Sequence, residues 1–178
     1  MLIHHLKVSG LLSFGPKGID LPLQPLNVLI GPNGAGKSYL LEVLSLLRAS
    51  PTKLPEPIKE MGGVREWLWK GPESKRAASI DAVIDYPQGR MPVRHVLEIG
   101  EHGERFEVTD ERIENQHKHP NKPDVFFYYR FQSGHPVLND LSDQHRGLRR
   151  ESVKPEESIL SQVHTTTGSQ SLGEAPTE

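Results

Sequence analysis

Residues 31–38 read Gly-Pro-Asn-Gly-Ala-Gly-Lys-Ser and match every fixed position of the phosphate-binding pattern G-x-x-x-x-G-K-[ST]. Directly before this pattern, residues 26–30 are nearly continuous in apolar side chains, which is typical of a strand covered on both faces of a sheet. Directly after it, leucines and a valine recur at helical spacing over most of the circumference until Pro51, which cannot continue a helix. The sequence therefore predicts a buried strand, a glycine-rich loop and a buried helix in succession.

The chemistry of the loop follows from what each residue type permits. The glycines have no Cβ atom, so the backbone can bring consecutive N–H groups close to a phosphate. We expect Lys37 to reach the β- and γ-phosphate oxygens, and the Ser38 hydroxyl to ligate a Mg²⁺ ion that bridges the same phosphates. The positive end of the helix dipole adds to this anion site. Ser38 is thus the predicted metal ligand, and the predicted nucleotide-binding residues of the loop are Gly31, Asn33, Gly34, Ala35, Gly36, Lys37 and Ser38.

Length and charge limit the classes of protein that fit. The 178 residues suffice for one domain with a sizeable core and are too few for two ordinary domains. With 21 basic and 23 acidic residues the net charge is −2, so DNA as a partner has no support from overall charge. A local basic cluster exists, although neighbouring glutamates favour a solvated linker there; it comprises Arg146, Arg149, Arg150 and Lys154.

The sequence also favours a soluble protein of the cytoplasm with no membrane partner. The absence of cysteine excludes disulfides and thiolate chemistry and fits a reducing compartment. The longest apolar stretches fall far short of the ~20 residues of a membrane-spanning helix. The first residues lack the charged, apolar and small-residue zones of a signal peptide.

The pattern along the chain predicts an α/β fold. Residues 1–25 alternate apolar and polar side chains between glycine turns, as short strands do. Residues 51–63 carry prolines and a Gly-Gly pair, so we expect a surface connection, followed by a helical turn over residues 64–69. From Ala77 onward the apolar period changes to two in four runs, the last at residues 125–131. These runs predict an antiparallel β-meander appended to the nucleotide-binding core.

The composition shifts near Leu141. We expect residues 1–140 to form the nucleotide-binding lobe, and residues 141–178 to form a polar linker and a disordered tail. The reason is that the tail is rich in Ser, Thr, Glu, Gln and Arg and has few apolar anchors after residues 159–160.

Three segments carry a family resemblance: residues 11–15 (Leu-Leu-Ser-Phe-Gly), residues 27–38 and residues 62–67 (Gly-Gly-Val-Arg-Glu-Trp). Together they resemble the N-terminal lobe of AAA-type ATPases related to RecF, SMC and ABC-type heads, in which the Pro-Asn-Gly form of the loop is typical. The resemblance implies an α/β core with a β-meander, ATP as the nucleotide, and head-to-head dimers that sandwich ATP. Complete members also have a helical lobe, a serine-glycine signature motif and a strand that ends in Asp-Glu. Those later parts are not recognisable here, so the chain resembles an incomplete head.

The catalytic residues of such an ATPase remain unknown from the sequence. Hydrolysis needs a carboxylate that holds Mg²⁺, and usually a glutamate beside it that orients water, at the end of a buried strand. Asp110-Glu111 is the only Asp-Glu pair, but the alternating residues before it describe a half-exposed antiparallel strand. Asp85 follows a more apolar run, yet Tyr86 and a Pro-containing turn come next. Both sites are interpreted as surface-strand carboxylates.

Other candidates carry less information. Residues 141–145 faintly resemble the signature motif but lack its glycines, so a polar linker is preferred. Gln162 corresponds, under the resemblance, to the glutamine that contacts the γ-phosphate. His117 and His119 flank a lysine in a polar loop, where solvated histidines are commoner than a metal site.

Three hypotheses therefore stay open. In the first, the chain is an ATPase domain that couples Mg-ATP binding and hydrolysis to conformational change, in DNA transactions or in anti-phage defence, a role implied by the resemblance alone. In the second, it is a truncated or split lobe that binds ATP without hydrolysing it and acts as an interaction module. Its partner is then a second copy or another polypeptide that supplies the missing lobe. In the third, the reading frame is cut short and the chain has no independent function.

Overall fold

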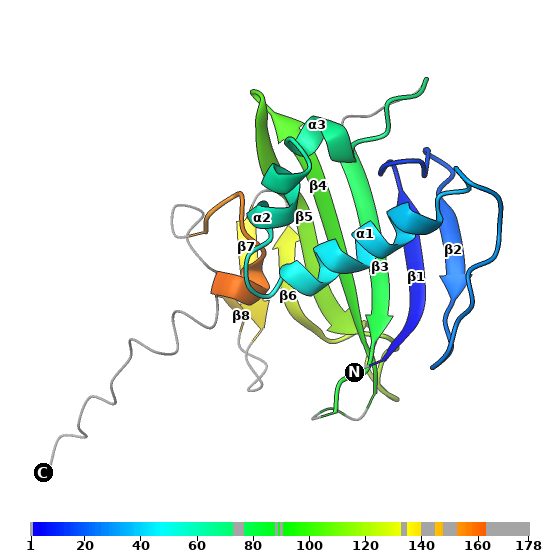
Figure 1. The fold of residues 1–178 in the computed structure, drawn as a ribbon. Coiled ribbons are helices and arrows are strands. Elements are labelled where there is room, and N and C mark those ends of the chain that lie inside the picture. The colour runs from blue at the N-terminus through cyan, green and yellow to red at the C-terminus, as the bar shows by residue number, and fades with distance from the viewer. Residues whose placement is uncertain are drawn as a thin grey trace, which may run out of the picture.

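An antiparallel sheet with helices on one face forms the body of the molecule (Figure 1). The computed structural model describes residues 2–72, 77–87, 89, 91–132, 135–139, 145–147 and 153–162. Within this part the sheet has eight strands in the order β2-β1-β3-β4-β5-β6-β7-β8, so that from β3 onward each strand pairs with its successor. The strands are β1 (Ile3–Ser9), β2 (Ile19–Pro22), β3 (Ala77–Ile84), β4 (Val93–His102), β5 (Arg105–Asn115), β6 (Phe127–Gln132), β7 (His135–Asn139) and β8 (His145–Gly147).

The core lies between this sheet and helices α1 (Lys37–Ala49), α2 (Pro55–Glu60) and α3 (Val64–Trp67). Alternate side chains of the central strands point towards the helices, as the two-residue period of a strand requires: Leu6, Val8, Ala78, Ile80, Ala82, Leu97 and Ile99. Helix α1 runs across β1 and β3 (Figure 1) and buries one stripe against them, formed by Leu40, Val43, Leu46 and Leu47. Trp67 is fully buried, and its indole N–H donates to the carbonyl oxygen of Pro57 at 3.3 Å.

The opposite face of the sheet carries charged side chains in cross-strand pairs. Arg94 on β4 donates to both carboxylate oxygens of Asp81 on β3, at 2.9 and 2.8 Å. Glu114 on β5 accepts from Arg94 at 3.1 Å and from Arg130 on β6 at 2.8 Å. Pairs of opposite charge on adjacent strands stabilise the pairing modestly. The sheet therefore has one apolar face under the helices and an opposite face on which these ion pairs lie beside the buried Val83 and Val96.

Several predicted elements are confirmed. The four alternating runs after Ala77 form the antiparallel meander β3 to β6, and the N-terminal region forms β1 and β2. Helix α1 begins at Lys37 and ends before Pro51, where the Ser50 hydroxyl donates to the carbonyl oxygen of Leu47 at 2.8 Å. Because that bond satisfies one of the last carbonyls, it helps to end the helix.

The predicted buried strand over residues 26–30 is wrong for this structure. These residues form no strand and are exposed, together with the rest of the connection between Gln24 and Ala35. A buried strand lies inside a sheet, with a hydrogen-bonded strand along each edge. Residues 26–30 instead follow β2, which lies at the edge of the sheet and pairs with β1 in the described part of the chain. The apolar run is present, but no strand of the described residues pairs with it.

One smaller expectation also differs. Helix α1 was expected to be buried over most of its circumference, but Leu41 is 57% exposed and Tyr39 is exposed as well. The helix has one layer of sheet below it and solvent above. The surface connection predicted at residues 51–63 includes the short helix α2, which Pro55 permits because proline is well tolerated in the first helical turn.

The division of the chain near residue 140 stays a prediction. Residues 141–144, Arg149, Arg150 and residues 163–178 lie outside the described residues, and so do the side chain of Arg146 and the expected disordered tail. Residues 153–162, in contrast, are described and pack against β5: the Val108 N–H donates to the carbonyl oxygen of Pro155 at 2.7 Å. None of the described helices combines the length and apolar character needed to cross a membrane.

The packing of α1 predicts a contrast between two leucines of the same helix. Replacement of the fully buried Leu46 by alanine leaves a cavity and should lower the free energy of unfolding by about 2–5 kcal/mol, measured by urea denaturation. The control Leu41→Ala removes an exposed side chain and should change it by about 0.5 kcal/mol or less. Equal effects would contradict the placement of α1.

Candidate functional site

The glycine-rich loop rests on a tight turn near the N-terminus. The backbone groups of Leu11 and Phe14 exchange two hydrogen bonds, at 3.0 and 2.8 Å, which close this turn. Gly36 lies against it, since a Cβ atom at Gly36 would come within 2.9 Å of the Ser13 hydroxyl oxygen. Gly36 also has a φ of 86°, in the left-handed region that favours glycine. Only glycine therefore fits the position from which α1 starts.

The first turn of α1 is open to an anion. Gly36 is the N-cap, no side chain accepts a hydrogen bond from the start of the helix, and the first turn contains no acidic residue. The first N–H groups of a helix have no partner within it and carry the positive end of its dipole. A phosphate group is a suitable acceptor for them.

Lys37 is engaged by the loop itself. Its ammonium group donates to the carbonyl oxygens of Gly31 and Pro32, each at 2.8 Å. These two bonds fold the lysine side chain back across the loop and place its positive charge beside the helix start. A bound phosphate would have to exchange with these carbonyls or share the ammonium group with them.

The rest of the loop lies on the surface. Gly34 has a φ of 83°, and no atom lies within 4 Å of the position that a Cβ atom would occupy there. Residues 31–35 and Ser38 are exposed, so the hydroxyl predicted to bind Mg²⁺ is accessible to solvent. Asn33 and Ala35 lie in the same exposed stretch, where the Ala35 N–H donates to the Pro32 carbonyl oxygen at 3.3 Å. The predicted loop residues thus form one accessible surface.

Gln162 lies away from this loop. In Figure 1 its segment, shown in orange, lies beyond the C-terminal end of α1, whereas the loop precedes the opposite end of that helix. Its carboxamide Nε2 donates to the carbonyl oxygens of Lys154 and Glu157, and its Oε1 accepts from the Lys154 N–H at 2.8 Å. These bonds close a loop over residues 154–162. The role of Gln162 at a γ-phosphate stays a prediction, and it requires these bonds to break.

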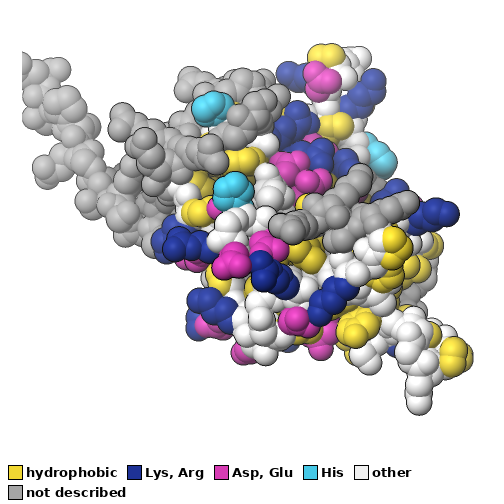
Figure 2. All heavy atoms as spheres, turned by 90° about the horizontal axis from the view of Figure 1, so that it is seen from above, with side chains coloured by type: hydrophobic (Ala, Val, Ile, Leu, Met, Phe, Trp, Pro, Cys, Tyr) yellow, Lys and Arg dark blue, Asp and Glu magenta, His cyan; other side chains and the backbone are white. Residues whose placement is uncertain are grey.

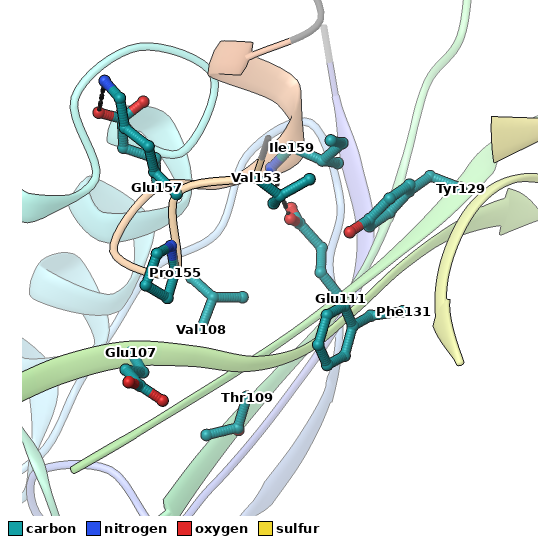
Figure 3. Close-up of a pocket in the computed structure, with 11 residues that line it drawn as sticks. Glu107, Val108, Thr109, Glu111, Tyr129, Phe131, Val153, Pro155, Glu157 and Ile159 are labelled. Atoms are coloured by element: carbon teal, nitrogen blue, oxygen red, sulfur yellow. Dashed lines mark hydrogen bonds and ion pairs between the residues drawn. The ribbon is translucent and has the colours of Figure 1, made fainter. Parts of the chain in front are cut away.

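The structure shows a buried polar cluster that the sequence interpretation missed. Glu111 on β5 is 2% exposed, and its carboxylate accepts from His95 Nε2 at 2.8 Å, from the Ser158 hydroxyl at 2.6 Å and from the Ile159 N–H at 2.7 Å. Figure 3 shows Glu111 pointing from β5 towards the segment that carries Ile159. The carboxylate therefore fixes residues 158–159 to the sheet.

A cavity of about 120 Å³ lies beside this cluster, between β5, β6 and residues 153–159. Its walls combine the buried Glu111 and Tyr129 with apolar side chains, among them Phe131 and Pro155 (Figure 3). Burial and the nearby Glu111 carboxylate raise the pKa of the Tyr129 hydroxyl. Each Glu111 oxygen already accepts a hydrogen bond from the protein, so the cluster is a structural one.

The interpretation of Asp110-Glu111 as a pair of surface carboxylates is wrong for Glu111. The strand register passes from Asp110, opposite Glu98, to Val108, opposite Ile99, and thereby skips Thr109. This bulge reverses the alternation of side chains along β5. Glu111 therefore points to the same side as Val108, the side of the helices, although the two residues are three positions apart. Asp110 faces the opposite side, where burial raises its pKa and its nearest cation is Arg112 at 3.1 Å. Side chains on opposite faces cannot act together on one phosphate.

Asp85 has a structural role at the N-terminus of the chain. Its carboxylate accepts from the Leu2 N–H at 3.2 Å and pairs with His4 Nε2 at 2.5 Å. The hydrogen bond from His4 holds the pKa of the Asp85 carboxyl below its usual value. The pair joins the ends of β1 and β3. Among the described residues, no group of three His, Asp or Glu side chains is arranged to hold a metal ion.

The Glu111 cluster predicts a loss of stability without a change in chemistry. Glu111→Gln replaces an acceptor oxygen by a donor and leaves a buried donor unsatisfied, so the free energy of unfolding should fall by about 1–3 kcal/mol. Amide hydrogen exchange at Ile159 should become faster. Glu107→Gln, on the same strand but less buried, is the matched control and should leave both quantities unchanged. An unaltered exchange rate at Ile159 in Glu111→Gln would contradict the account.

The His4–Asp85 pair predicts a pH dependence at low pH. Because the folded-state pKa of Asp85 is lowered, its contribution to stability is present above the unfolded value of about 4 and is lost as the pH falls through the folded value. Carbon-detected NMR titration should find the Asp85 pKa below about 3.9. In His4→Ala the Asp85 pKa should rise, because the hydrogen bond from His4 is the largest cause of the lowering, and identical titration curves would show that the pair does not form in solution.

Comparison with known protein families gives a match over most of the chain. A family model described as "AAA domain, putative AbiEii toxin, Type IV TA system" matches residues 26–162, well over half of the chain. The match begins with the exposed apolar run, includes the whole glycine-rich loop and ends at Gln162. Comparison with curated proteins gave no match.

Proposed function

Because the chain belongs to this family of AAA domains, we propose that it binds ATP together with Mg²⁺ at residues 31–38. The observation that carries the proposal is the coincidence of three features at one surface. The loop sequence is complete, Gly36 has the backbone conformation that only glycine adopts easily, and the first turn of α1 carries no acidic residue or side-chain cap. Together they favour a site for a bound polyphosphate.

In the proposed complex the loop would bind the nucleotide through backbone N–H groups and through the side chains of Lys37 and Ser38. The N–H groups from Asn33 to Lys37 would bind the phosphates, and the Lys37 ammonium group would donate to phosphate oxygens in place of the Gly31 and Pro32 carbonyl oxygens. The exposed Ser38 hydroxyl would be the protein ligand of Mg²⁺, and the metal would supply positive charge that offsets the charge of the phosphates. The family match and the chemistry of these donor groups are consistent with binding of Mg²⁺ and ATP.

The finer assignment is to the RecF, SMC and ABC-like branch of these ATPases. In that role the domain couples ATP binding and hydrolysis to conformational change, in DNA transactions, in anti-phage defence or, as the family description suggests, in a toxin–antitoxin system. The support is the Pro-Asn-Gly form of the loop and the β-meander beside it. Figure 2 shows basic and acidic side chains intermixed on the face that it displays, so on this face DNA gains no support from charge.

A second candidate function is nucleotide binding without hydrolysis. It is favoured by the positions of the carboxylates: Asp85 is bound to His4 and Leu2, Glu111 is bound to Ser158 and Ile159, and Asp110 faces the polar side of the sheet. Asp110 and Glu111 also lie far along the sheet from the N-terminal strand: their strand, β5, is three strand intervals from β1, or roughly 14 Å at the usual spacing. The chain would then act as a nucleotide-loaded interaction module.

Replacement of Lys37 tests the proposed site. Lys37→Ala removes the charge expected to contact the β- and γ-phosphates, and the dissociation constant for Mg-ATP in isothermal titration calorimetry should rise at least about tenfold. Lys53→Ala is the matched control, because Lys53 is an exposed lysine beyond the end of α1 that pairs with Glu56. An unchanged affinity in Lys37→Ala would refute the proposal.

A turnover assay separates the two candidate functions. If the chain binds without hydrolysing, release of phosphate from Mg-ATP should stay near the rate in buffer, and Glu111→Gln should not alter it. Turnover at the rate of an ordinary ATPase, abolished by Asp110→Asn or by Glu111→Gln in protein that circular dichroism shows to be folded, would instead establish hydrolysis that depends on the substituted carboxylate.

A further inference from the structure

The segment directly before the phosphate loop exposes more apolar surface than a solvated loop needs. The side chains of Leu26, Val28 and Ile30 are 82%, 74% and 90% exposed, and that of Leu29 is 44% exposed. A single exposed leucine is ordinary, but four such residues within five positions form a patch of the kind that marks an interaction surface. In Figure 2 hydrophobic side chains protrude on the right, the side on which Figure 1 shows β2 and the segment that follows it.

The backbone of this segment is also unpaired. Across the described ranges, no backbone-to-backbone hydrogen bond involves residues 25–30. A local turn starts the segment, since Asn27 Nδ2 donates to the Gln24 carbonyl oxygen at 2.6 Å and the Gln24 N–H donates to Asn27 Oδ1 at 3.0 Å. Pro25 and Pro32, which lack an N–H group, bound the stretch that can pair. Five residues with free backbone groups are a template for another strand.

We propose that residues 26–30 are a docking strand for an apolar β-strand of another polypeptide. The inference rests on the proposed function, because the docking strand leads directly into the nucleotide loop, and it names the partner of that site. Only an extended partner supplies both the backbone hydrogen bonds and the apolar side chains that the segment lacks. A helix or a lipid surface would cover the side chains but leave the backbone groups unpaired.

A second copy of the chain fits less well than a different polypeptide. Two copies of residues 26–30 could pair with each other, but each would then cover one edge of its partner and leave the second edge open. The other large apolar side chains exposed in the described part are Tyr39, Leu41 and Tyr86, which lie on α1 and after β3 and form no unpaired strand. A partner with two apolar strands can flank the docking strand on both edges.

Docking also affects the nucleotide loop. Pairing of residues 26–30 fixes the backbone up to Gly31 and Pro32, whose carbonyl oxygens hold the Lys37 ammonium group at 2.8 Å. The partner strand therefore favours one arrangement of the loop, and nucleotide binding and partner binding strengthen each other by the same factor.

The test uses the full 178-residue chain and a defined probe, the peptide Lys-Val-Ile-Val-Ile-Val-Lys. Amide hydrogen exchange should slow at least about tenfold at alternate residues of the stretch 26–30, those whose N–H groups point to the edge that the peptide covers, and the dissociation constant for Mg-ATP should fall about fivefold or more. The same peptide with proline at its central position should have neither effect. Val28→Asp should abolish the protection, whereas the control Tyr86→Asp, another exposed apolar position, should retain it.

Three other results would separate the docking strand from a contact between two copies and from the nucleotide site. Unchanged exchange at residues 26–30 with millimolar peptide overturns the docking strand, even if Mg-ATP binds. Protection that develops without peptide as protein concentration rises, together with dimers in sedimentation velocity, assigns the segment to a second copy and overturns the proposal. Peptide protection with no binding of Mg-ATP leaves the docking strand standing and refutes the nucleotide site alone. Circular dichroism of Val28→Asp verifies that this exposed substitution leaves the fold intact.

Discussion

The packing of α1 on the apolar face of the sheet determines where the candidate site lies. Leu40, Val43 and Leu46 fit the surface of β1 and β3, and this contact fixes the axis and the first residue of the helix. Gly36 meets the turn at Ser13 and Phe14 at that point, so the glycine-rich loop is held between two parts of the same core. The phosphate-binding chemistry depends on this contact, because amide groups bind an anion well only when their direction is fixed.

The two sides of the loop differ in how much of their surroundings the chain supplies. On the helix side, the core, the turn below Gly36 and the start of α1 are complete. On the strand side, residues 26–30 leave β2 without joining a sheet in the described part of the chain. Lys37 meanwhile satisfies two loop carbonyls. A nucleotide would replace the Lys37 contacts with the loop carbonyls, and a partner strand would supply the backbone pairing that residues 26–30 lack. The two proposals therefore concern neighbouring parts of one loop.

The sequence predicted the elements whose determinants are local. The period-two runs after Ala77, the turn residues between them and the limit at Pro51 act within a few residues, so the meander and α1 were found. The site residues of the loop follow from a contiguous motif. Burial, in contrast, depends on neighbouring elements. Residues 26–30 have the composition of a buried strand, but composition alone does not show whether other strands pair with them.

Glu111 shows a second limit of prediction from sequence. Counting by two from Val108 places Asp110 inside and Glu111 outside, but the bulge at Thr109 reverses this order. Counting backwards by two from Ile113, on the other side of the bulge, would have placed Glu111 on the inner face. The partners Ser158 and Ile159 lie 47 and 48 residues away in the chain, and no local pattern brings them to it.

Binding of a nucleoside triphosphate by the loop can be observed in a titration of the isotopically labelled chain with Mg-ATP, followed by amide NMR. If the loop binds the nucleotide, the largest shifts should occur at the N–H groups of residues 33–38, since these would surround the phosphates. Signals of the Glu111 cluster, at Ile159 and His95, should stay in place. Shifts confined to β5 and residues 153–162, or no shifts at saturating Mg-ATP, would contradict it.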